Sequence, residues 1–204
     1  MQLLDDIRTP ECRAFAEAWQ GWRGAELVPR RAAVRIEEIG KLLPLITVLE
    51  LVSEDSAIFR LAGTDLFDAL GIDLTGLDFY AMTTPETRAI RVARTIQAGQ
   101  RPCGTHYLHP IVYQSGRTVP SEVVSLPVWP DDPTDPPQFF SISMALDETK
   151  LDGTVAEPRQ LPIGDGYQFV DIGAGVPDED LNLADRPPAV FPSSEPLNTQ
   201  LGER

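Results

Sequence analysis

The chain has few cysteines and no long apolar run, which are the features that disulfide cross-links and membrane-spanning helices require. Only two cysteines occur among 204 residues, Cys12 and Cys103, and they lie in segments of different character. The sequence therefore predicts reduced thiols and no disulfide framework. No apolar run approaches the ~20 residues of a membrane-spanning helix, and Asp5 and Asp6 stand where a signal peptide carries positive charge. We expect a soluble cytoplasmic protein.

Positive charge is also scarce. The chain has 17 Lys and Arg residues against 31 Asp and Glu residues, which gives a net charge of -14 and a pI near 4.4. Such a charge repels phosphate backbones, so nucleic acid is excluded as an expected partner. With 42% hydrophobic residues the chain can bury one sizeable core, and we predict one domain with appended segments.

Residues 149–204 are predicted to form an acidic, proline-rich tail. Beyond Lys150 lie seven of the 19 prolines and ten acidic residues against three arginines. Most of this segment has too few apolar residues to offset the entropy lost on ordering. Tyr167, Phe169 and Ile172 are the exception and are expected to dock as one short strand or extended segment. The end around Pro187 is expected to be disordered.

Residues 1–44 are predicted to form a helical extension. Thr9 can cap a helix and Pro10 suits its first position, while Gly21 and Gly24 favour its end. A second helix is expected from about Ala33 to Pro44. The first helix carries one aromatic stripe outside the presumed sheet core, and we interpret this stripe as a homodimer interface; its residues are Phe15, Trp19 and Trp22.

Residues 45–148 read as strands around a helical middle. A hairpin is expected over residues 45–62, short helical pieces at residues 64–70 and 78–82, and a longer helix from Pro85 to Gly99. Three strands are expected at residues 105–113, 118–129 and 138–146. In the last of them Phe140, Ile142 and Met144 alternate with small residues, which is the period of a strand.

Several short motifs within this order resemble the PAS domain family. They are the run Phe59-Arg60-Leu61-Ala62-Gly63-Thr64, the pairs Leu70-Gly71 and Thr75-Gly76, and the helix start Thr84-Pro85-Glu86. The whole is similar to bacterial stand-alone, single-domain PAS-like proteins. The resemblance implies an α+β fold: a five-stranded antiparallel sheet with helices on one face, an N-terminal helical extension at residues 1–44 and an irregular C-terminal tail.

The resemblance also implies a sensory or signalling module. It would bind a small ligand or a protein partner, or both, and pass the signal in trans. Cys12 and Cys103 lie in no flavin-binding cysteine motif, and residues 84–99 contain no histidine for haem, so neither cofactor is expected and the cofactor is left unknown. Two alternatives stay open: a ligand-free protein-docking adaptor, and a small acid-base enzyme with a cone-like α+β fold using Glu122, His106 and Asp78.

The space between sheet and helices is the predicted ligand site, for a small apolar or carboxylate ligand. Its expected lining is Phe59, Leu61, Phe67, Phe79, Met82, Ile96, Tyr107, Val124, Phe140 and Ile142. Polar candidates near it are Tyr107, His106, Ser141 and Glu122.

Each of three further polar patterns has both a structural and a functional interpretation. Cys103, His106 and His109 have a metal-like spacing, but residues three apart on a strand face opposite sides, so no metal site is predicted. Arg88, Arg91 and Arg94 form a basic row, interpreted either as a solvated helix face or as a contact for an anionic ligand or acidic partner. Arg60 either anchors a carboxylate ligand or forms a salt bridge to a residue such as Asp65.

Overall fold

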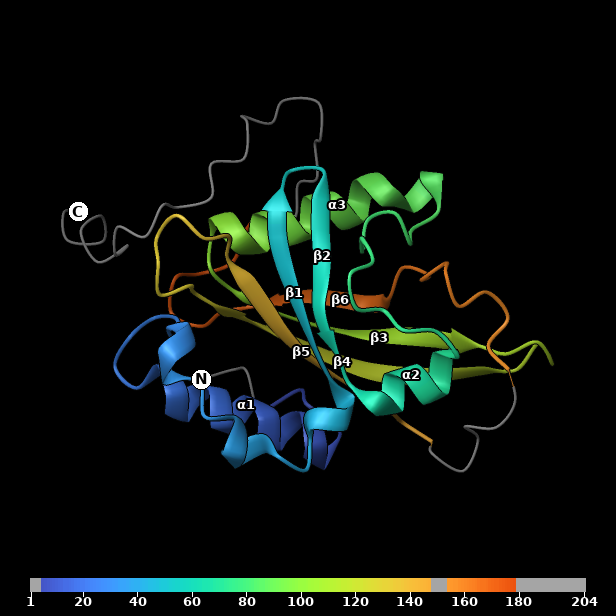
Figure 1. The fold of residues 1–204 in the computed structure, drawn as a ribbon, viewed down its shortest axis with the longest axis horizontal. Coiled ribbons are helices and arrows are strands. Elements are labelled where there is room, and N and C mark those ends of the chain that lie inside the picture. The colour runs from blue at the N-terminus through green and yellow to red at the C-terminus, as the bar shows by residue number, and fades with distance from the viewer. Residues whose placement is uncertain (1–4, 148–153, 179–204) are drawn as a thin grey trace.

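The computed structural model describes residues 5–147 and 154–178, which form one antiparallel sheet with helices on both faces (Figure 1). The predicted α+β class is confirmed. In chain order the elements are α1 (Pro10–Arg23), the 3-10 helices η2 (Arg31–Ala33), η3 (Ile36–Ile39) and η4 (Leu43–Leu45), β1 (Ile46–Ser53), β2 (Ser56–Ala62), α2 (Thr64–Leu70), α3 (Pro85–Gln100), β3 (Gly104–Val112), β4 (Thr118–Val128), β5 (Gln138–Ala145) and β6 (Asp165–Val170). Of the helices in the described ranges, none combines the length and the apolar character needed to cross a bilayer.

The six strands lie in the order β2-β1-β5-β4-β3-β6. The first five strands are those expected from residues 45–146, and the sixth comes from the C-terminal segment. β6 pairs with β3, with Thr105 opposite Phe169 and His106 opposite Gln168. The expectation that the segment around Tyr167 docks as a short strand is therefore confirmed. The end around Pro187 lies outside the described residues.

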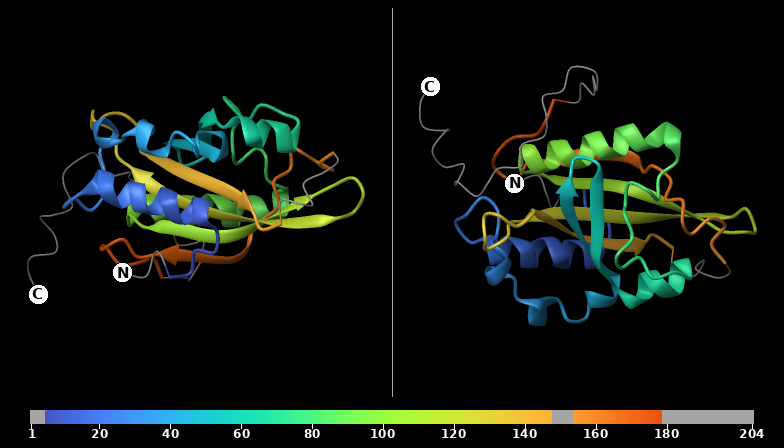
Figure 2. Two further views of the ribbon diagram at one scale, coloured as in Figure 1. Left: turned by 90° about the horizontal axis from the view of Figure 1, so that it is seen from below. Right: turned by 45° about the horizontal axis from the view of Figure 1, so that its top comes forward.

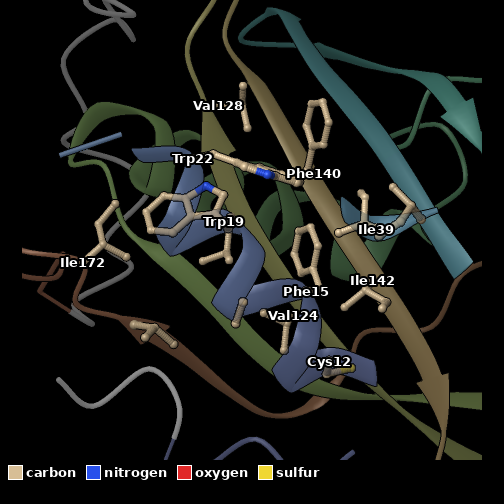
Figure 3. Close-up of a cluster of buried hydrophobic side chains, with 14 of the residues drawn as sticks. Cys12, Phe15, Trp19, Trp22, Ile39, Val124, Val128, Phe140, Ile142 and Ile172 are labelled. Carbon is tan, nitrogen blue, oxygen red and sulfur yellow. The ribbon is translucent and has the colours of Figure 1, made fainter. Parts of the chain in front are cut away.

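Helix α1 forms for the reasons that its sequence indicates. The Thr9 hydroxyl accepts a hydrogen bond from the Cys12 N–H, Pro10 occupies the first turn, and Gly24 ends the helix at φ 54°. Its apolar stripe is not exposed, because it packs against β4 and β5 of the same chain (Figure 3). Helix α1 and helix α3 consequently cover opposite faces of the sheet (Figures 1 and 2).

The second helix predicted from Ala33 to Pro44 does not form. The structure has three separate 3-10 turns there, η2, η3 and η4. Tertiary contacts override local propensity at the first two turns: the Arg31 N–H in η2 donates to the Trp129 carbonyl at 2.8 Å, and Trp22 Nε1 donates to Glu38 Oε2 in η3 at 3.0 Å. Ile39 is 1% exposed and packs in the cluster beneath α1.

Strand alternation divides the buried residues into two cores. In β5, Phe140 and Ile142 face α1, whereas Phe139 faces α3. Because both faces of the central strands are covered, neighbouring residues of one strand belong to different cores. The sheet face on which a residue lies therefore decides whether it can reach the candidate site.

Candidate functional site

A cavity of about 160 Å³ lies between α3, α2 and the sheet face opposite α1. Its walls are mostly apolar, with Leu49 and Phe59 from the hairpin, Phe79 from the loop before α3, and Phe139 from β5. The segment just before β6 closes it with Leu161, Ile163 and Gly164. Apolar walls with a few polar groups are the usual character of small-molecule sites.

Polar side chains enter this cavity from α3 and from the strands beneath it. They include Arg91 and Arg94 from α3, Tyr107 and His109 from β3, and Tyr167 from β6. Tyr107 and His109 lie two residues apart on β3, and in a strand this spacing places both side chains on the same sheet face. Burial raises the pKa of both Tyr107 and Tyr167, so their phenols stay neutral hydrogen-bond donors at neutral pH.

Arg91 joins the cavity to the closing segment. Its side chain is 8% exposed, and its Nη2 donates to the Leu161 and Pro162 carbonyls at 2.7 and 2.9 Å. The guanidinium lies over the Phe79 ring, 4.4 Å from its centroid. Desolvation lowers the pKa of Arg91, but a guanidinium begins so far above neutrality that it remains charged.

Arg94 joins the cavity to β6. Its guanidinium carbon lies 4.0 Å from the centroid of the Tyr167 ring, and Tyr167 stacks on Tyr107 with centroids 5.6 Å apart. A cation over a tyrosine ring is attracted by the ring quadrupole. The three side chains therefore connect α3, β3 and β6 on one side of the cavity.

His109 is expected to remain neutral well below the usual titration range of histidine. Desolvation, with a smaller contribution from the Arg91 charge, lowers its pKa from 6.5 to about 4. Because the folded pKa is the lower one, the unfolded chain binds this proton first, and stability is lost as the pH falls from about 6.5 towards 4. An NMR titration should show the His109 ring titrating near pH 4, with its signal assigned by its loss in His109→Gln. A midpoint near 6.5 would contradict the burial of this ring.

The structure brings together only part of the predicted ligand-site set. Phe59, Phe79 and Tyr107 line the cavity, as does the polar candidate Ser141. Met82 and Ile96 are buried at 4% exposure, but neither borders the cavity. The remaining predicted residues lie elsewhere.

Two errors in the prediction explain why the other predicted residues do not border the cavity. Val124, Phe140 and Ile142 lie on the opposite sheet face and pack against α1, because alternation assigns them to the other core (Figure 3). Leu61 and Phe67 are 41% and 49% exposed, since Phe67 lies on the outer side of α2 and Leu61 is near the end of β2. Sequence reasoning named His109 and Arg91 but did not include either of them in the lining of the ligand site. The signal for His109 was its two-residue spacing from Tyr107.

The aromatic stripe expected to form a dimer interface is buried within the chain. Phe15, Trp19 and Trp22 are 0%, 1% and 5% exposed. Trp19 Nε1 also donates to the Pro127 carbonyl of β4 at 2.8 Å. The sheet covers this stripe, because α1 packs on the sheet of the same chain.

Two of the arginine interpretations are also corrected. Arg60 pairs with Glu50 across the β1–β2 ladder, with Nη2 and Oε1 2.6 Å apart, and not with Asp65. In α3, Ala89 is exposed and Arg91 is buried, so the basic row is not a uniformly solvated face. The helix is turned so that Arg91 and Arg94 border the cavity.

Glu122 and His106 do meet, but on the α1 side of the sheet. Glu122 is 0% exposed, and its Oε1 accepts from His106 Nε2 at 2.8 Å and from the Arg8 N–H at 2.7 Å. Its Oε2 accepts from both the N–H and the hydroxyl of Thr9 at 2.7 Å. His106 Nδ1 lies 3.0 Å from the Gln168 amide nitrogen in β6 and accepts from it.

This network joins the segment before α1 and strand β6 to the centre of the sheet. Burial alone would raise the pKa of Glu122, but hydrogen bonds from Arg8, Thr9 and His106 outweigh it and lower the pKa from 4.5. Both carboxylate oxygens are occupied by donors, and neither Glu122 nor His106 borders the cavity. Asp78 is likewise occupied, since its carboxylate accepts from the Tyr80 N–H at 2.8 Å. The geometry needed for an acid-base site facing the cavity is not met by these residues.

The Cys-His-His spacing behaves as strand geometry requires. His106 faces the Glu122 network, whereas His109 faces the cavity, and Cys103 is buried in the core beside α3. Within the described ranges no group of three or more His, Cys, Asp or Glu side chains is placed to hold a metal ion.

Both thiols are expected to be inert in the folded protein. Cys12 and Cys103 are 0% exposed, and burial raises the pKa of each to about 12. A thiolate is the reactive form, so at pH 8 a colorimetric thiol reagent should detect almost no thiol in the folded protein and two per chain in guanidinium. Rapid release of one equivalent from the folded protein would show that one of the two sites opens easily.

Comparison with known proteins identifies the family of the chain. A search of curated proteins finds no match to the chain. The PAS domain sequence model matches residues 7–142, about two thirds of the chain, from the segment before α1 into β5. The matched region includes four of the five central strands completely and the helices on both sheet faces, whereas β6 lies beyond it. This chain therefore belongs to the PAS domain family.

Proposed function

We propose that this protein is a sensory PAS module in which a small molecule occupies the cavity between the sheet and α3. PAS domains are sensory and signalling modules, typically without enzymatic activity of their own. The observation that carries the proposal is the cavity itself, which combines apolar walls with converging arginine, tyrosine and histidine side chains.

The signal would leave through the closing segment and β6. Leu161, Gly164 and Tyr167 border the cavity, and Arg91 binds two carbonyls of the same segment. An occupant that contacts these residues would favour one position of β6 over another, and a ligand shifts a conformational equilibrium only through such differential contacts. A separate protein that binds β6 or the acidic segment after it would read the change in trans.

A native mass spectrum of freshly purified protein tests the proposal. We expect a population heavier than the chain by the mass of one small molecule, released on denaturation. Ala69→Phe in α2 should fill the cavity and remove this adduct, because Ala69 borders it. Asp68→Phe is the matched control, since it adds the same ring at an exposed position of the same helix. Loss of the adduct in both variants, or in neither, would mean that it binds elsewhere.

A ligand-free docking adaptor is the second candidate. Two exposed apolar side chains favour it, Phe67 at 49% and Leu61 at 41%. Exposed apolar side chains mark protein contacts where they lie together in one patch. A native mass equal to that of the chain alone, with Phe67→Ser weakening capture of a protein partner, would favour the adaptor over the sensor.

A further inference from the structure

The cavity carries positive charge without a compensating carboxylate. Arg91 and Arg94 both border it, and no described residue that borders it is Asp or Glu. The pairs Arg35–Glu38, Arg60–Glu50 and His106–Glu122, which lie within residues 5–147, do not involve either arginine. In a protein with a net charge of -14, two arginines without such a partner beside one cavity indicate a specific role.

The Arg91 guanidinium keeps donors that the closing segment does not use. Its Nη2 is used by the Leu161 and Pro162 carbonyls, while its Nε is buried and has no hydrogen-bond acceptor within the described part of the chain. A buried charged donor without an acceptor is costly. A carboxylate is the acceptor that fits a guanidinium edge best, because its two oxygens match the planar N–H groups.

The size and walls of the cavity limit the rest of such a ligand. A volume of about 160 Å³ is close to the roughly 150 Å³ of an engineered apolar cavity in another protein that binds benzene. Phe59, Phe79 and Phe139 supply aromatic walls. The neutral phenols of Tyr107 and Tyr167 border the same space and add donors suited to an anion.

We infer that the cavity recognises a small monocarboxylate whose apolar part is about one ring in size, with the carboxylate beside the guanidinium groups of Arg91 and Arg94. This inference rests on the proposed function, that the cavity binds a small molecule. It adds the charge and size of the ligand. Arg91 would then contact both the ligand and the segment that leads into β6.

Three probes of similar size separate the effect of the ligand's charge from the effect of its shape. Benzoate and benzamide differ in the charge of one group, and toluene lacks that group altogether. In titrations followed by calorimetry and by NMR of Tyr107 and His109, benzoate should bind about 10- to 100-fold more tightly than benzamide, the effect of one charge-assisted interaction. This comparison uses the unmodified protein and does not depend on the folding of a variant.

Variants then assign the contact. Arg91→Met and Arg94→Met should each reduce benzoate affinity about tenfold or more and leave toluene binding within about threefold. The matched control is Arg60→Met, which removes an arginine 50% exposed and paired with Glu50, and should leave both affinities unchanged. If Arg91→Met proves unfolded by circular dichroism, Arg94→Met and the probe comparison still decide the question.

The possible outcomes distinguish the carboxylate inference from the proposal that the cavity binds a small molecule. Equal binding of benzoate, benzamide and toluene, with shifts at Tyr107 and His109, would overturn the carboxylate inference and leave the ligand cavity intact. Failure of all three probes to shift these residues would overturn both. Benzoate binding that survives Arg91→Met and Arg94→Met would place the anion elsewhere and also overturn the inference.

Discussion

Glu122→Ala is expected to lower the free energy of unfolding by about 3–5 kcal/mol, the usual cost of removing one partner from a buried charged network. The carboxylate accepts four hydrogen bonds from Arg8, Thr9 and His106, and its side chain is 0% exposed. Its loss leaves buried donors without acceptors. It also removes a negative charge from the N-terminal end of α1, where the helix dipole favours one.

Urea denaturation of the wild type and the variant measures this effect. Glu50→Ala is the matched control, because Glu50 is another strand carboxylate that pairs with the half-exposed Arg60 and accepts from Gln138 Nε2, and a smaller loss is expected since Arg60 can turn to water. Equal losses in the two variants would show that Glu122 acts as an ordinary strand residue. Faster amide exchange in α1 and β6 of Glu122→Ala would indicate that these two elements detach together.

The same carboxylate gives the protein an acid-sensitive component of stability. Because hydrogen bonds lower the folded pKa of Glu122 below 4.5, its contribution is present above the unfolded pKa and is lost as the pH falls through the folded pKa. The difference in stability between the wild type and Glu122→Gln should therefore shrink as the pH is lowered from 6 to 3. A difference that stays constant over this range would mean that the charge of Glu122 contributes nothing.

Element order and helix starts were predictable because they depend on local chemistry. The Thr-Pro starts at Thr9 and Thr84 place α1 and α3 correctly, and alternation over residues 138–146 places β5. The segment from Ala33 to Pro44 was not predictable, because its turns are fixed by contacts with Trp129 and with Trp22 of α1. Propensity is a weak guide where tertiary contacts decide the backbone.

The site was less predictable because both sheet faces are buried. Phe139 and Phe140 are adjacent, apolar and both nearly inaccessible, so alternation shows that they face opposite ways but not which of them faces the cavity. Arg91 was left out of the predicted lining for a different reason: arginine is rarely buried, and a basic row on a helix is usually solvated. Its position depends on the rotation of α3 about its own axis, which the segment before β6 helps to fix through two carbonyls.

Trp19→Ala is expected to destabilise the protein by about 3–5 kcal/mol, the range measured for removal of large buried aromatic side chains. Trp19 is 1% exposed in the core between α1 and the sheet, and its loss also leaves the Pro127 carbonyl without its indole donor. Urea denaturation should show the loss, with Glu17→Ala, at an exposed position of the same helix, as the control. If the stripe instead joined two copies, light scattering would show Trp19→Ala halving the mass while its stability at low concentration stayed unchanged. The burial of Trp19 within one chain favours the opposite result, a large fall in stability at constant mass.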